Sequence, residues 1–181
     1  MKKYPFLSLL LLICSPVAMA QAVEDNDTAR IEVQEKDVAF KAVKTKDKSL
    51  TEAQQTALNN KLERIIAKNN ASIVGECAAF GIKAEIEVLD KKSTAGLVRN
   101  VTVMTAEVTL TAFNIKDESI YYTHSVKVET DVVGDNKAAM DKLIQSIKVT
   151  DPQFVRFIRT ARKRIAKWYN EHQQPLPMLQ K

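Results

Sequence analysis

Alternating apolar and polar positions run through three stretches in the middle of the chain and predict three β-strands. The first stretch covers residues 80–88, the second runs from about residue 98 to residue 114, and the third covers residues 120–132. Such period-two alternation is typical of strands that bury one face and expose the other. Because the three stretches follow one another closely, they predict an antiparallel meander with one apolar face.

The apolar face of this meander can be written down residue by residue. Its predicted members are Phe80, Ile82, Ala84, Ile86, Val88, Met104, Ala106, Val108, Leu110, Ala112, Ile120, Tyr122, His124, Val126, Val128 and Val132. The opposite face carries mainly threonines and charged residues. An apolar sheet face needs a second layer to cover it, and in this chain only helices are left to supply one.

Three segments have apolar residues at helical spacing. The first follows N-cap candidates within residues 47–52 and ends near Asn69 and Asn70, which tolerate a left-handed backbone. The second spans residues 135–147, and the third starts at Pro152, a residue favoured in a first helical turn. Their predicted apolar residues are Ala53, Ala57, Leu58, Leu62, Ile65, Ile66, Ala139, Met140, Leu143, Ile144, Ile147, Phe154, Phe157, Ile158, Ala161, Ile165 and Trp168.

A shorter alternation over residues 31–42 predicts one or two additional strands. The sequence therefore predicts an α+β fold: a three- to four-stranded, mainly antiparallel sheet with one face covered by two or three helices. We expect a single α+β domain over residues 30–172. A flexible acidic leader over residues 21–29 would precede it, and a C-terminal tail over residues 173–181 would follow it.

The first twenty residues, 1–20, have the three parts of a signal peptide. Lys2 and Lys3 are basic, an apolar run follows, and Ala18-Met19-Ala20 is an A-x-A cleavage site. The apolar run is about eight residues long, well short of the roughly twenty that cross a bilayer. We therefore expect cleavage after Ala20, a periplasmic or secreted protein, and no transmembrane segment in the mature chain.

Cys14 offers an alternative to cleavage after Ala20, because its surroundings resemble the lipobox of bacterial lipoproteins. A lipobox has a small residue directly before the cysteine, whereas this chain has Ile13. A lipid anchor at Cys14 is therefore the less favoured interpretation. After cleavage Cys77 would be the only cysteine left, so no intramolecular disulfide is predicted.

Composition excludes several functional classes. The chain has 181 residues and a net charge of +5, which falls to +3 when the two lysines of the signal peptide are removed. Four glycines leave little room for a phosphate-binding loop, and no hydrolase, nucleotide-binding or zinc motif occurs. Two histidines without neighbouring ligands do not make a metal site. We expect no cofactor, no metal and no catalytic residue.

The strongest charge feature is a basic run in the last predicted helix. Residues 152–171 contain six arginines and lysines and one acidic residue, Glu171. Spacings of three and four place a subset on one helical face, namely Arg156, Arg159, Lys163 and Lys167. This face is the candidate binding site, for an envelope protein or an anionic surface ligand. Nucleic acid is not expected as a ligand outside the cytoplasm. The alternative to a binding site is that these four residues form an ordinary solvated helix face.

From Val38 onward, the order of a strand, a long helix, a three-strand meander and a helix resembles the small periplasmic domains of bacterial envelope-assembly lipoproteins. These are the curli-secretion-channel, penicillin-binding-protein-activator and flagellar-assembly groups. The segments that carry the resemblance are DVAFKAV, TEAQQTALNNKLERIIA, FGIKAEIEV, VMTAEVTLTAF and GDNKAAMDKLIQSI. The resemblance implies a non-catalytic partner-binding module and transfers no functional residue.

Two functional hypotheses follow. The first is an exported, non-catalytic cell-envelope binding or assembly module that acts through protein–protein or anionic-ligand contacts. The second is a small periplasmic hydrolase-like enzyme that uses His124, which lies on the apolar face of its predicted strand, together with a carboxylate. The enzyme would require His124 to open onto a cleft and to face that carboxylate within hydrogen-bonding distance.

Overall fold

The computed structural model describes residues 32–73, 78–95 and 100–172, all of which belong to one compact unit, Glu32–Gln174. The predicted signal peptide, the acidic leader, the C-terminal tail and both cysteines lie outside the described residues.

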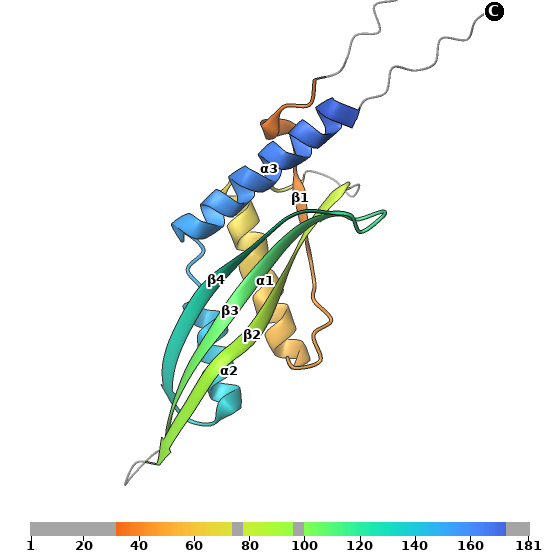
Figure 1. Cartoon of the computed structure of the whole chain (residues 1–181). Coiled ribbons are helices and arrows are strands. Elements are labelled where there is room, and N and C mark those ends of the chain that lie inside the picture. Colours follow the sequence, from red (N-terminus) through yellow and green to blue (C-terminus); the bar gives the residue numbers. More distant parts are fainter. Residues whose placement is uncertain (1–31, 74–77, 96–99, 173–181) are drawn as a thin grey trace, which may run out of the picture. The chain divides into compact units, whose positions relative to one another are not determined.

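A four-stranded sheet in the order β1-β2-β3-β4 forms the centre of the fold (Figure 1). The strands β2 (Phe80–Ala95), β3 (Asn100–Asn114) and β4 (Ile120–Val133) form the predicted antiparallel meander. The short strand β1 (Phe40–Val43) runs parallel to the first residues of β2. The mainly antiparallel sheet that the sequence predicts is therefore confirmed, with four strands.

Three α-helices lie on one side of this sheet (Figure 1). They are α1 (Glu52–Lys68), α2 (Asn136–Ser146) and α3 (Pro152–His172). A short 3₁₀ helix, Glu35–Asp37, precedes β1, so residues 32–43 hold one strand and not two. The predicted α+β class is confirmed, and its helical layer has three members.

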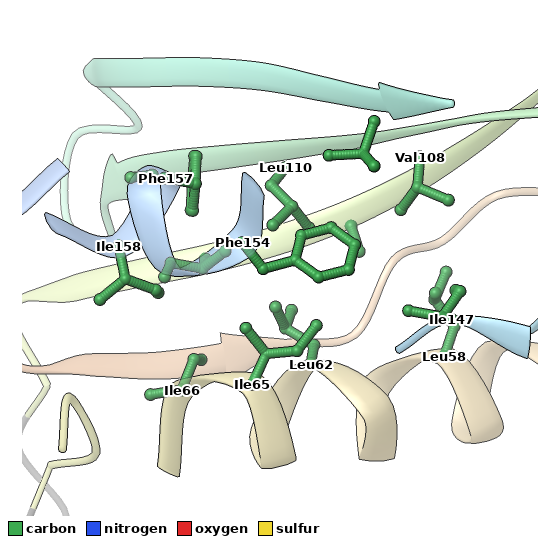
Figure 2. Packing of buried hydrophobic residues seen from close by; sticks show 14 of the residues in the cluster. Leu58, Leu62, Ile65, Ile66, Val108, Leu110, Ile147, Phe154, Phe157 and Ile158 are labelled. Carbon is green, nitrogen blue, oxygen red and sulfur yellow. The ribbon is translucent and has the colours of Figure 1, made fainter. Parts of the chain in front are cut away.

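Apolar residues of the three helices and of one sheet face meet in a single core (Figure 2). Leu58, Leu62, Ile65 and Ile66 of α1 point toward the sheet and toward Phe154 of α3. On the sheet side, the predicted face of β3 is buried throughout, with Met104, Ala106, Val108, Leu110 and Ala112 each at most 4% exposed. The core thus holds the buried side of α3 in place, while the opposite side of this helix faces solvent.

A capping box begins α1, as the polar residues before it predict. The Thr51 hydroxyl accepts a hydrogen bond from the Gln54 amide at 3.3 Å, and the Gln54 side chain accepts one from the Thr51 amide at 3.0 Å. Gln54 also donates to Asp141 of α2 at 2.8 Å. Gln54 is therefore buried, whereas Ala53 and Ala57, which were predicted to face the core, are exposed.

Three other residues that the sequence pattern places on an apolar side of a strand or helix are exposed to solvent. Ile120 is 64% exposed because the β3–β4 register shifts at the next residue, Tyr121, which turns Ile120 to the other face. Val88 is 41% exposed and precedes a similar bulge in β2. Trp168 is 42% exposed because it lies at the border of the buried side of α3.

Candidate binding surface on the last helix

Helix α3 has a strongly amphipathic sequence, which determines the face that it turns to solvent. Its buried residues are Phe154, Phe157, Ile158, Ala161, Ile165 and Ala166. These recur at spacings of three and four, which places them on one side of an α-helix with 3.6 residues per turn. Side chains half a helical turn away must therefore point into solvent.

The predicted binding residues lie on that solvent side. We call Arg156, Arg159, Lys163 and Lys167 the basic stripe, and all four are exposed. They span twelve helical positions. The eleven steps between the first and the last, at 1.5 Å each, make about 16 Å along the helix. The structure therefore brings the four cations together on one surface, as their spacing predicts.

Little negative charge lies on the basic stripe. Among the described residues, its one ion pair joins Lys167 to Glu171 at 3.6 Å, one helical turn further along α3. Both side chains are more than half exposed, and such pairs contribute little energy. Within the same part of the chain, Arg156, Arg159 and Lys163 form no ion pair and can meet an external anion.

The two remaining cations of the run, Arg162 and Arg164, do not belong to the stripe. Arg162 points inward and donates to three backbone carbonyls, those of Val38 at 2.9 Å, Asn69 at 3.4 Å and Asn70 at 2.6 Å. Burial lowers the pKa of Arg162 from its ordinary value, and the nearby Glu35 carboxylate opposes that effect. Arg162 therefore holds the chain before β1 and the end of α1 against α3.

Arg164 leads to the histidine that the alternative hypothesis invokes. Its guanidinium lies 4.5 Å from the centre of the Tyr122 ring, a cation–π distance. The Tyr122 ring in turn stacks on Phe157 at 5.5 Å and lies parallel to the His124 ring at 6.3 Å. His124 is thus half-buried in an aromatic layer on the helix side of β4.

The alternative hypothesis requires a carboxylate within hydrogen-bonding distance of His124. No hydrogen bond or ion pair in the described part of the chain joins His124 to a carboxylate. The same residues hold no cluster of three or more His, Cys, Asp or Glu side chains that could bind a metal ion.

No helix in the described part of the chain combines the length and the apolar character needed to cross a membrane.

A second group of aromatic residues, which was not predicted from the sequence, surrounds the C-terminal end of α3. The Trp168 ring stacks on His172 at 4.5 Å and packs edge-on against Tyr121 at 5.7 Å and Tyr169 at 5.1 Å. Burial, with a contribution from the neighbouring Tyr121, raises the pKa of Tyr169. The signal for this group was the aromatic pair Trp168-Tyr169 at the edge of the apolar stripe.

Comparison with known proteins gives likeness in structure only. No protein-family profile and no curated protein matches the chain. A lipoprotein candidate from Caulobacter crescentus has 11% identity and a TM-score of 0.37, covering 72% of this chain and 89% of its own. A minor lipoprotein from Acinetobacter baumannii has 10% identity and a TM-score of 0.35, covering 76% and 94%.

A third solved structure, a Xanthomonas campestris protein of the DUF330 family, has 11% identity and a TM-score of 0.31, covering 65% of this chain and 61% of its own. With identities and TM-scores this low, the likeness carries no argument about function. The resemblance to the curli-secretion, penicillin-binding-protein-activator and flagellar-assembly groups stays a prediction from the sequence.

Proposed function

We propose that this protein is an exported, non-catalytic binding module of the bacterial cell envelope that docks on an anionic surface through the basic stripe of α3. The observation that carries the proposal is the position of the stripe. Its four cations are exposed and lie opposite the buried side of a helix anchored in the core. Within the described residues their one ion pair, between Lys167 and Glu171, is solvent-exposed.

A rigid row of cations suits a ligand with several negative charges. Four side chains along about 16 Å of helix can contact neighbouring phosphates or carboxylates at the same time. Near an anionic lipid surface each lysine or arginine contributes about 1 kcal/mol of attraction. Phospholipid headgroups of the envelope and an acidic patch on an envelope protein both offer such charges. The export signal favours these ligands over nucleic acid.

Charge reversal tests the stripe directly. The double variant Arg159→Glu/Lys163→Glu should bind vesicles of phosphatidylglycerol and phosphatidylcholine at least about tenfold more weakly than the unmodified protein, measured by co-sedimentation. Binding of the unmodified protein should also fall as salt rises to physiological strength, where the Debye length is about 8 Å. Because the substituted residues are exposed, the melting temperature should hardly change.

A matched control separates the stripe from net charge. The variant Lys48→Glu/Lys116→Glu changes the net charge by the same amount at two exposed positions outside α3 and should bind the vesicles almost as well as the unmodified protein. Loss of vesicle binding in both variants would mean that net charge alone is responsible. Equal binding by the stripe variant and the unmodified protein at every salt concentration would refute docking through the stripe. If the ligand is an acidic envelope protein and not a lipid, a pull-down should recover it with the unmodified protein and the control variant but not with the stripe variant.

A further inference from the structure

Strand β2 has an edge that no other strand of the described structure covers. The pairing with β1 ends where Val43 meets Lys83, and the chain then leaves the sheet toward α1. The next residues of β2, Ala84–Val88, pair with β3 on one side only. No backbone hydrogen bond from outside the sheet reaches them in the described part of the chain. Their outward N–H and C=O groups are available to a new partner.

A cavity of about 890 Å³ lies beside this edge. Apolar side chains of the sheet, Ile86, Val88 and Met104, form part of its lining. The start of α1, with Gln54, and the start of α2, with Met140, supply further lining residues. Ile86 and Met104 are 6% and 3% exposed, so the cavity reaches down to the core.

The bare backbone edge and the apolar part of the cavity lining together select the chemistry of the ligand. The rest of the lining is polar and includes Asp47, Glu87, Asp90, Lys91 and Lys137. A lipid tail could fill the cavity but would leave the peptide groups of β2 without hydrogen bonds. An extended peptide can satisfy both, because its backbone pairs with the strand while alternate side chains point to one face of the sheet. The methionines Met104 and Met140 can adapt to side chains of different shape.

The ends of this site are also defined by the structure. On one side it continues the line of β1, so an added strand would begin beside β2 where the β1 pairing ends at Val43. The linker Lys44–Asp47 borders this end of the site, because it lines a cavity together with Lys83 and Glu85. On the other side the register of β2 shifts around Leu89, and the strand beyond carries Asp90 and Lys92, an ion pair at 3.2 Å. Bulges and charges of this kind discourage pairing at a sheet edge. The edge is therefore unprotected over the five residues Ala84–Val88. The cavity adjoins the second half of this stretch, Ile86–Val88, and continues along β2 as far as Lys91.

We propose that the β2 edge Ala84–Val88 binds a short extended peptide of another protein, which adds to the sheet as a strand and places an apolar side chain in the cavity between α1 and α2. The edge of β4 is a weaker candidate, because the cavity lined by its residues is about 280 Å³, much smaller than the cavity of about 890 Å³ beside β2. This site is separate from the basic stripe and does not depend on it.

The experiment begins with the protein purified from the periplasm of a bacterial host. Peptides of nine residues are selected on it from a random phage-displayed library, and an enriched peptide is synthesised as the probe. We expect it to slow amide hydrogen exchange at Ala84–Val88. A copy of the probe with alternate backbone nitrogens methylated should bind at least tenfold more weakly, because it cannot complete the ladder of hydrogen bonds.

Two substitutions on the same helix provide a matched pair. Lys137 lines the cavity and Lys142 does not, and both are exposed on α2. Lys137→Trp should fill the cavity and weaken the probe at least tenfold, whereas Lys142→Trp should leave its affinity unchanged. Arg159→Glu/Lys163→Glu should also leave it unchanged, so failure of the stripe proposal and failure of this one give different results.

Several outcomes would overturn the proposal. One is that no peptide is enriched; another is that enriched peptides bind equally well after backbone methylation and to Lys137→Trp. If the protein without peptide shows concentration-dependent protection of Ala84–Val88 together with a doubled mass, the occupant of the edge is a second copy of the chain.

Discussion

Arg162 shows at the scale of one residue how a charge in a basic run can be structural. Its guanidinium donates to the carbonyls of Val38, just before β1, and of Asn69 and Asn70, at the end of α1. Replacing it by methionine keeps much of the apolar stem but leaves these carbonyls without their donor. We expect Arg162→Met to lower the free energy of unfolding by about 2–3 kcal/mol, measured by urea denaturation.

The comparison for Arg162→Met is Arg159→Met, because Arg159 belongs to the basic stripe and is exposed. That variant should stay within about 0.5 kcal/mol of the unmodified protein. Equal losses of stability in the two variants would show that Arg162 does not hold the chain as its hydrogen bonds indicate.

The bulge at Tyr121 makes a second residue-scale prediction. The alternation of β4 puts Ile120 and Val126 on the same face, but Ile120 is 64% exposed and Val126 is 3% exposed. Val126→Thr should cost about 1–3 kcal/mol of stability, because it buries a hydroxyl group in an apolar site. Ile120→Thr, which makes the same kind of change and keeps a β-branched side chain, should cost less than about 0.5 kcal/mol in the same chemical denaturation. Similar costs for both would mean that β4 has no bulge.

At the scale of an element, the start of α1 depends on its cap. The Thr51 hydroxyl accepts a hydrogen bond from the Gln54 amide, one of the N–H groups of the first turn that have no partner within the helix. Thr51→Ala should therefore lower the free energy of unfolding by about 1 kcal/mol. Thr56 lies inside the same helix and is exposed, and within the described residues its hydroxyl donates one hydrogen bond, to the carbonyl of Glu52. Thr56→Ala should therefore be neutral or slightly stabilising. A cost for Thr56→Ala as large as that for Thr51→Ala would contradict the assigned cap.

The elements themselves follow from local pattern, because one face of each is buried. In β3 all five predicted core residues are buried, since this strand has neighbours on both sides and the extra residues of the two bulges lie in β2 and β4. In α1 the ending at Asn69-Asn70 was predicted, and Asn70 has a φ of +50°. Periodicity cannot reveal a bulge, because one extra residue changes the face without changing the composition. The position of Ile120 was therefore missed. Val88 keeps the predicted face, since it pairs with Ala106 before the bulge, and it is exposed where it lines the cavity beside β2.

The basic stripe was accessible to sequence analysis, whereas the edge site was not. Spacing alone separates Arg156, Arg159 and Lys163 from the apolar side of α3, and it also places Arg162 four residues after buried Ile158, a signal that the sequence analysis did not use. The cavity beside β2 depends on where β1 stops and how α1 and α2 approach the sheet. These are long-range properties of the packing, and no local pattern encodes them.

At the scale of the whole molecule, compartment decides which ligands the basic stripe can meet. The leader with Lys2, Lys3 and Ala18-Met19-Ala20 predicts that the exported protein begins at Gln21. Mass spectrometry of the protein recovered from a bacterial periplasm should give the mass of residues 21–181. A species that begins at Cys14 and carries a diacylglyceryl group would instead show a lipoprotein, held at the membrane by its own anchor.

Trp168 gives this protein an optical reporter of its own. It is the one tryptophan in the chain, it is 42% exposed, and it lies next to Lys167 of the basic stripe on α3. Its indole stacks on His172 and touches Tyr121 of β4, so its emission depends on contacts within α3 and between α3 and the sheet. Fluorescence of the unlabelled protein can therefore follow docking in real time and report, in the same cuvette, whether α3 stays attached to the sheet.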